Sequence, residues 1–241
     1  MPSVQHTRKE VLLKLVYYGP GLGGKTTNLE FIHARSNPEH RGRLLSLNTE
    51  TERTLFFDLL PVDLGSFKGY KIRLHLCTVP GQVAYDRTRQ LILKNVDGVV
   101  FVVDSQPAAV EKNAESLANL ATNLRLQGVD PERVPVVVQF NKRDLFGVLD
   151  AGELRIALGI PARVPEIEAS AKYGQGVFET LKTIVKECMR LVGDPARLPE
   201  GRTPSILPGH RASMYPGAAP PPSIALPRAP RVPRIPGDPE R

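Results

Sequence analysis

Eight residues near the N-terminus, 19–26, have the types and spacing needed to hold the phosphates of a nucleotide. Their sequence is G-P-G-L-G-G-K-T, between a buried-strand pattern and a helical one, as a phosphate-binding loop requires. Glycines let backbone N–H groups close around phosphate oxygens, and the helix start adds positive potential. Lys25 is expected to contact the β- and γ-phosphates, and the Thr26 hydroxyl to coordinate Mg²⁺. The loop therefore predicts binding of a nucleoside triphosphate by Gly19, Gly21, Leu22, Gly23, Gly24, Lys25, Thr26 and Thr27.

Two later stretches have the residue types needed to recognise a purine base. In Asn141-Lys142-Arg143-Asp144, the Asp144 carboxylate can accept hydrogen bonds from the N1–H and 2-amino groups of guanine. Adenine lacks this pair of donors, so it would leave a buried charge unpaired. In Ser170-Ala171-Lys172, the backbone amide of Ala171 could contact the guanine oxygen. We therefore predict guanine contacts from Asn141, Lys142, Asp144, Ser170, Ala171 and Lys172, and an ATP-using enzyme stays an alternative.

A third motif, Thr78-Val79-Pro80-Gly81-Gln82, closes a strand in which apolar and polar residues alternate. Gly81 would allow the backbone to approach a γ-phosphate closely, and Gln82 could orient the attacking water. These residues predict that the bound triphosphate is hydrolysed.

Short apolar runs alternate with helical patterns over the first 192 residues, which predicts an α/β fold with a mostly parallel central sheet flanked by helices. Strands are expected over 11–18, 70–78, 99–104 and 134–140, with a weaker candidate over 44–48. The strand over 70–78 should have one less buried face. Helices are expected over 26–34, 83–94, 110–127, 153–158 and 177–192.

The last 49 residues, 193–241, are rich in proline and too poor in apolar residues to fold alone, so we predict a disordered tail after a domain over 1–192. Within it, P-R-x is repeated three times from Pro227 to Pro236. In a polyproline II helix the arginines would line one edge and suit a PxxP-reading domain or an acidic surface. A soluble spacer is an equal alternative.

Composition excludes several classes of protein. The chain has no apolar run of membrane-spanning length, signal-peptide pattern or lipidation motif, so we expect a cytoplasmic protein without a membrane span or lipid anchor. The net charge of +7 is spread along the sequence, which does not indicate nucleic-acid binding. Cys77 and Cys188 fall in apolar patterns and are expected to be core thiols.

Together, the G-P-G-L-G-G-K-T-T, T-V-P-G-Q, N-K-R-D and S-A-K motifs resemble those of Ras-like small GTPases. Within these, residues 47–58 and Thr78 resemble the bacterial MglA group of polarity and gliding-motility GTPases, over roughly residues 10–192. The resemblance implies a Ras-like P-loop GTPase fold and a molecular switch that uses GTP, GDP and Mg²⁺. A scaffold that binds GTP with little hydrolysis is the alternative.

Two positions depart from the ordinary Ras-like pattern. Thr78 stands where most GTPases have the aspartate that holds a Mg²⁺-bound water. Asp58 or another group could replace it, or the metal could rely on Thr26 and the phosphates alone. Arg53 matches the arginine that acts within the same chain as an arginine finger in the MglA group. Thr54 matches the group's switch threonine, expected near Mg²⁺ and the γ-phosphate. From spacing alone, Thr49 and Thr51 are equivalent candidates.

The resemblance also implies partners. MglA-type GTPases are accelerated by roadblock proteins, usually dimers, which reposition the GTPase's own arginine and glutamine. Motility or polarity effectors and a position at a cell pole are further expectations from the resemblance. The apolar stretches 55–57 and 59–61 could form the contact surface or belong to the core.

Overall fold

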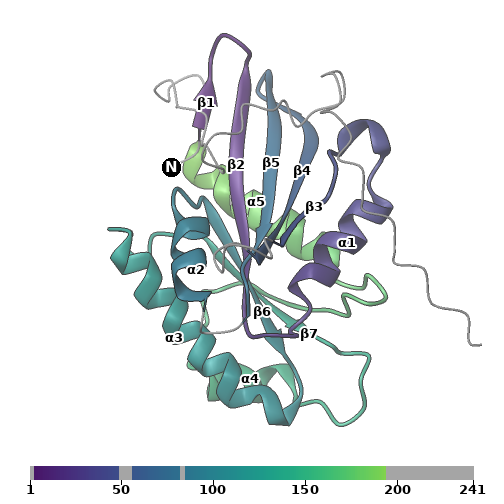
Figure 1. Ribbon diagram of the computed structural model, residues 1–241, viewed down its shortest axis with the longest axis vertical. Coiled ribbons are helices and arrows are strands. Elements are labelled where there is room, and N and C mark those ends of the chain that lie inside the picture. The colour runs from purple at the N-terminus through teal and green to yellow at the C-terminus, as the bar shows by residue number, and fades with distance from the viewer. Residues whose placement is uncertain (1–2, 49–55, 82–84, 194–241) are drawn as a thin grey trace, which may run out of the picture.

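The computed structural model describes residues 3–48, 56–81 and 85–193, and Figure 1 shows their arrangement. It has the predicted α/β architecture, with helices on both faces of a central sheet (Figure 1). The strands are β1 Ser3–Gln5, β2 Glu10–Tyr18, β3 Leu45–Asn48, β4 Phe56–Phe67, β5 Tyr70–Thr78, β6 Gly98–Asp104, β7 Val136–Asn141 and β8 Glu166–Glu168. The helices are α1 Lys25–Arg35, α2 Asp86–Leu93, α3 Val110–Leu126, α4 Ala151–Ala157 and α5 Val177–Val192, with short 3-10 turns at Pro38–His40 and Pro107–Ala109.

The strands form one mixed sheet in the order β3-β4-β5-β2-β6-β7-β8, and β1 pairs with β2. Neighbours from β5 to β8 are parallel, whereas β3, β4 and β5 pair antiparallel. Two apolar layers cover the faces: α1 and α5 pack on one side, and α2, α3 and α4 on the other. Burial on both faces explains the continuous apolar runs of β2, β6 and β7.

Strand β4 was not predicted, because its apolar residues were divided between two short stretches. The described side chains in those stretches, Phe57, Leu59, Leu60 and Pro61, are all buried. They form part of the core, so they cannot be an exposed contact surface. Strands β1 and β8 were also missed, since three residues are too few to produce a periodic pattern.

Two further details differ from the sequence analysis. The polar face of β5 is exposed at Lys71 but buried from His75 onward, where the strand packs against the α2–α4 layer. Leu191 lies within the helix predicted over 177–192 and is apolar, yet it is 67% exposed because it falls outside the face that α5 turns to the sheet. Cys77 and Cys188 are buried free thiols, which confirms that prediction.

The predicted tail lies outside the described residues apart from Gly193, so the division at residue 193 stays a prediction. Among the described residues, no helix has both the length and the apolar character needed to cross a membrane.

Candidate nucleotide-binding site

The phosphate loop, residues 19–26, lies between the end of β2 and the first turn of α1 (Figure 1). Gly24 has φ 98° directly before the helix, a left-handed conformation that suits glycine. A Cβ atom there would also lie 2.2 Å from Asn141 Nδ2. Gly81 approaches the same loop, since a Cβ atom on it would lie 2.2 Å from Gly21 Cα. The glycines therefore allow three segments to meet at the loop.

Lys25 is the first residue of α1, and its ammonium group is buried inside the loop. Its Nζ donates hydrogen bonds to the carbonyl oxygens of Gly19 at 3.0 Å and Pro20 at 2.6 Å. Burial lowers the pKa of Lys25 to about 7; Arg89 lowers it further, and Asp58 opposes the shift. Carbonyl groups do not neutralise a buried cation, so this environment fits a polyanionic ligand.

A cluster of hydroxyl groups surrounds the Asp58 carboxylate beside the loop. Oδ2 of Asp58 accepts hydrogen bonds from Thr26 Oγ1 at 2.7 Å and Thr78 Oγ1 at 2.9 Å. Thr78 Oγ1 also accepts one from the Asp58 backbone N–H at 2.9 Å. On the other oxygen, Ser46 Oγ donates to Oδ1 at 2.7 Å. A carboxylate from β4 therefore lies directly against Thr78, the position at which the sequence lacks one.

The chemistry of this cluster fits Mg²⁺. That ion is usually bound by one or two carboxylates together with water and substrate phosphates. Asp58 and the Thr26 hydroxyl supply such a partial set of oxygen ligands. Among the residues that the structure describes, no group of three or more His, Cys, Asp and Glu could hold a metal by itself. The remaining ligands would therefore have to come from the nucleotide and water.

Two adjoining cavities follow the loop. One, of about 390 Å³, lies over the phosphate side and is lined by Lys25, Thr26, Asp58, Thr78 and Gly81, among others. The other, of about 360 Å³, is lined by Asn141, Lys142, Asp144, Ala171 and Lys172, among others. Leu22, Gly24 and Thr27 line both cavities. Their shared wall means that one ligand with a phosphate end and a base end could extend through both.

Asn141, the last residue of β7, joins the base side to the phosphate loop. Its Nδ2 donates to the Gly23 carbonyl at 2.8 Å, and its Oδ1 accepts from the Ala171 backbone N–H at 2.8 Å. Lys142 has φ 69° and donates to Asp104 Oδ2 at 2.6 Å. These contacts hold the N-K-R-D and S-A-K segments against the loop as one unit.

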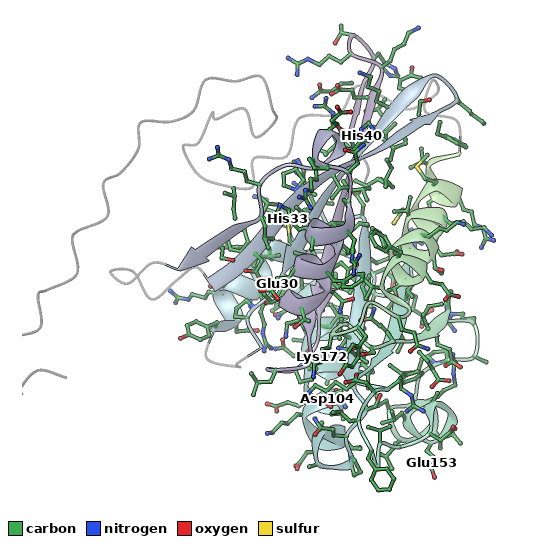
Figure 2. All side chains as sticks on the ribbon, turned by 90° about the vertical axis from the view of Figure 1, so that its right-hand side faces the viewer. Glu30, His33, His40, Asp104, Glu153 and Lys172 are labelled. Carbon is green, nitrogen blue, oxygen red and sulfur yellow. The ribbon has the colours of Figure 1, made fainter. Side chains whose placement is uncertain are left out.

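Asp144 lies in the same cavity, where its Oδ1 accepts a hydrogen bond from Ser170 Oγ at 2.6 Å. A second carboxylate oxygen is thus available to meet a base. Figure 2 labels Asp104 and Lys172 in the half of the molecule away from His40, so the base side lies at the end of α1 opposite to the 3-10 turn of His40.

The sequence analysis missed Arg89, which is 1% exposed in α2. Its Nε donates to the Pro80 carbonyl at 2.9 Å, and an NH group donates to Asn119 Oδ1 at 2.7 Å. Asn119 in turn donates to the Asp86 carboxylate at 3.0 Å. Arg89 therefore connects α2 and α3 to the backbone at Pro80, next to Gly81. Within a predicted helix, one arginine gives no signal that it is buried.

All the predicted phosphate-loop and base-side residues fall at this site, together with Gly81. Of these, Leu22 is 93% exposed at the rim. The predicted catalytic residues Arg53 and Gln82, the switch residue Thr54, and the alternatives Thr49 and Thr51 lie outside the described residues.

Comparison with known proteins agrees with this geometry. Residues 48–188 match the model of the ADP-ribosylation factor family. The mutual gliding-motility protein MglA of Myxococcus xanthus is 53% identical over 186 residues, covering 77% of this chain and 95% of that protein. Elongation factor 4 of Thermus thermophilus is 33% identical over 170 residues, covering 69% of this chain but 27% of the factor. The second similarity is therefore confined to one part of a larger protein.

The identity to MglA extends over nearly the whole relative, and the residues that match the family model, 48–188, include 141–144 and 170–172 of this chain. The chain accordingly binds GTP or GDP and Mg²⁺, and the predicted molecular switch and GTP hydrolase are confirmed. The chain belongs to the ADP-ribosylation factor family and, within it, to the MglA-type small GTPases.

Proposed function

We propose that this GTPase is a switch for gliding motility and cell polarity, and that its catalytic groups come from segments next to the Asp58 cluster. The observation that carries this proposal is the hydrogen-bonded set of Thr26, Asp58 and Thr78. It joins the phosphate loop to β4, which follows residues 49–55 in the sequence, and to β5, which ends four residues before residue 82. Motility as the process is taken from the name of the Myxococcus xanthus relative.

In this proposal the guanine base occupies the cavity of Asp144 and Lys172, and the phosphates lie along the loop. The Asp144 carboxylate accepts hydrogen bonds from the base. Ser170 keeps the carboxylate of Asp144 in its orientation by donating a hydrogen bond of 2.6 Å to it. Lys25 turns its ammonium group from the loop carbonyls to the β- and γ-phosphates. Gly81 lies close enough to Gly21 for its backbone to face the terminal phosphate.

Mg²⁺, when bound, neutralises charge on the phosphates. Thr26 Oγ1 can offer a lone pair to the ion and still donate its proton to Asp58, because the hydroxyl has both functions. Asp58 would then hold a water of the ion in place of the missing aspartate at Thr78. Thr54 is proposed as the second threonine near the ion.

Hydrolysis forms a bond from water oxygen to the γ-phosphorus and breaks its bond to the bridging oxygen, releasing phosphate and GDP. Gln82 is proposed to orient the water, and Arg53 to stabilise the negative charge on the transferring group. Arg89 holds the Pro80 carbonyl at 2.9 Å, so it would limit where the following Gly81-Gln82 segment can lie.

A dimeric roadblock-type protein is the proposed activator, acting by placing Arg53 and Gln82 rather than by donating its own arginine. Effectors of polarity or motility would bind the GTP form at a cell pole. Residues 193–241 are proposed as a separate Pro- and Arg-rich tail that a PxxP reader or an acidic surface could bind.

Replacing Arg53 or Gln82 by alanine tests the catalytic assignment. With a stoichiometric roadblock dimer, we expect phosphate release from the GTP-loaded chain to fall at least about 100-fold, because transition-state groups of this kind contribute on the order of 10³-fold or more. Retention of labelled GTP should not change. Arg87→Ala, which alters an exposed arginine of α2, is the control. No phosphate release by the unaltered chain with or without the partner, while GTP is retained, would instead indicate a scaffold.

Asp58→Asn should weaken Mg²⁺ binding to the GTP complex by at least about tenfold. The substitution removes the negative charge of Asp58 and keeps the size of the side chain. A hydrogen bond to a charged group contributes on the order of 1.5–3 kcal/mol, and this contribution would be lost. The measurement is a Mg²⁺ titration of nucleotide dissociation. Asp63→Asn is the matched control, because Asp63 lies on the same strand but pairs with Arg73 at 3.3 Å. Equal Mg²⁺ affinity in both variants would remove Asp58 from the ion site.

Asp144→Asn should shift base preference from GTP to xanthosine triphosphate, because an amide can donate to the xanthine oxygen that replaces the 2-amino group. Competition of the two nucleotides against a fluorescent GDP analogue measures the preference. Asp130→Asn, in the loop after α3, is the control. Unchanged selectivity would refute the role of Asp144.

Nucleotide binding should take up a proton at alkaline pH. The pKa of Lys25 is about 7 in the chain alone, and phosphates beside the ammonium group would raise it. Protonated Lys25 favours nucleotide binding. Its contribution to the free energy of binding is therefore complete below about pH 7 and decreases as the pH rises above that value. Calorimetry at pH 8 in buffers of different ionisation enthalpy measures the uptake. Lys25→Arg stays charged, so a similar uptake in that variant would contradict the prediction.

A further inference from the structure

Two hairpin turns project from the end of the sheet opposite the phosphate loop (Figure 1). One connects β1 to β2 through residues 6–9, and the other connects β4 to β5 through Lys68 and Gly69. They lie side by side, because the Lys71 backbone N–H donates to the Lys9 carbonyl at 2.7 Å. We call residues 6–10 and 63–71 together the hairpin tip.

The hairpin tip carries a local excess of positive charge. Arg8, Lys9, Lys68 and Lys71 are all exposed. The tip has two acidic residues, Glu10 and Asp63. Each forms an ion pair of 3.3 Å with Arg73, which lies between them on β5. The fold therefore brings together cations from two separate parts of the sequence. Within the tip, both acidic residues pair with Arg73, so the four exposed cations outnumber the carboxylates.

Apolar side chains lie among these cations. Leu64 is 45% exposed and Phe67 is 38% exposed, although large apolar groups are usually buried. Lys68 Nζ lies 5.6 Å from the centre of the Phe67 ring. A lysine next to an exposed aromatic ring can keep its charge in water or at a lipid headgroup while the ring enters an apolar layer.

The backbone adds a further observation. Lys9 has φ 49° and Lys68 has φ 48°, in the left-handed region where glycine and asparagine are the usual residues. Each turn therefore has a lysine at a position whose backbone conformation disfavours it.

We propose that the hairpin tip binds the surface of an anionic lipid bilayer. The tip is formed by two projecting turns, and a convex end with cations and two exposed apolar groups fits a deformable lipid interface better than a preformed protein pocket. Anionic headgroups attract each nearby lysine or arginine by roughly a fivefold factor in binding. The apolar pair Leu64 and Phe67 would enter the headgroup layer.

This orientation leaves the nucleotide site free. Strand β2 extends from Glu10 at the tip to Tyr18 at the phosphate loop. Nine residues of strand span roughly 26 Å, more than the Debye length of about 8 Å at physiological salt. Membrane charge would therefore barely affect nucleotide affinity, and the cavities would face away from the bilayer.

Co-sedimentation of the full chain with phosphatidylcholine vesicles, with and without phosphatidylglycerol, tests the proposal. Binding is expected with the anionic lipid and should be lost in roughly 1 M salt, where charges are screened beyond about 3 Å. Lys9→Asn combined with Lys68→Asn removes two cations and suits the left-handed backbone, so the fold should persist. Partitioning should fall about 25-fold, since two factors of about five are removed.

Lys182→Gln combined with Lys186→Gln is the matched control, because both lysines are exposed on α5. It should partition like the unaltered chain, and GDP binding should be the same in all variants. Equal losses in both double variants would overturn the proposal. Leu64→Ser with Phe67→Ser should also reduce binding to vesicles. If that variant binds the vesicles normally while Lys9→Asn with Lys68→Asn does not, the tip binds the bilayer through charge alone, and the proposed entry of Leu64 and Phe67 into the headgroup layer is overturned.

Discussion

The site depends on one carboxylate that three hydroxyl groups hold in place. Asp58 receives hydrogen bonds from Thr26 of α1, Thr78 at the end of β5 and Ser46 of β3. Each donor comes from a different element, so the position of the carboxylate depends on how all of them pack. An ionised group buried in this way is stable only if its oxygens are satisfied. The cluster therefore links the arrangement of the strands to the chemistry at the phosphate loop.

The base side is built differently. Asn141 holds Gly23 and Ala171 by two hydrogen bonds of 2.8 Å, so the loop and the S-A-K segment are fixed to the end of a buried strand. Both partners are backbone groups, which are positioned by the parallel sheet itself. In the proposed switch, recognition of the base would thus remain constant, while the phosphate side would respond to the bound nucleotide. This division suits a switch, which must hold its ligand in two states.

Residue patterns predicted the parallel part of the fold well, because it depends on local sequence. The residues predicted to contact the base also come from local motifs, and the structure brings them together in one cavity. Buried runs such as 99–104 and motifs such as N-K-R-D keep their meaning without tertiary contacts. The antiparallel part was harder. Strand β4 has an irregular register between Asp63 and Ser66 and a proline at position 61, so it lacks a clear period. Arg89 was missed because its role arises from tertiary contacts. It contacts Pro80 across a turn, and Asn119 lies far from it in the sequence.

The replacement of an aspartate at position 78 by threonine has a structural consequence. A carboxylate on β5 would be fixed by pairing with β2 in the parallel sheet, over eight residues from Lys71 to Thr78. In this chain the carboxylate belongs to β4, whose place is set by antiparallel pairing of Ser46 with Asp58 and of Leu59 with Cys77. A shift of β4 by two residues would preserve the faces of the strand but move Asp58 by about 7 Å. In the proposed site, Mg²⁺ binding would therefore depend on the register of β4, the strand that joins the residues around Arg53 to the hairpin tip.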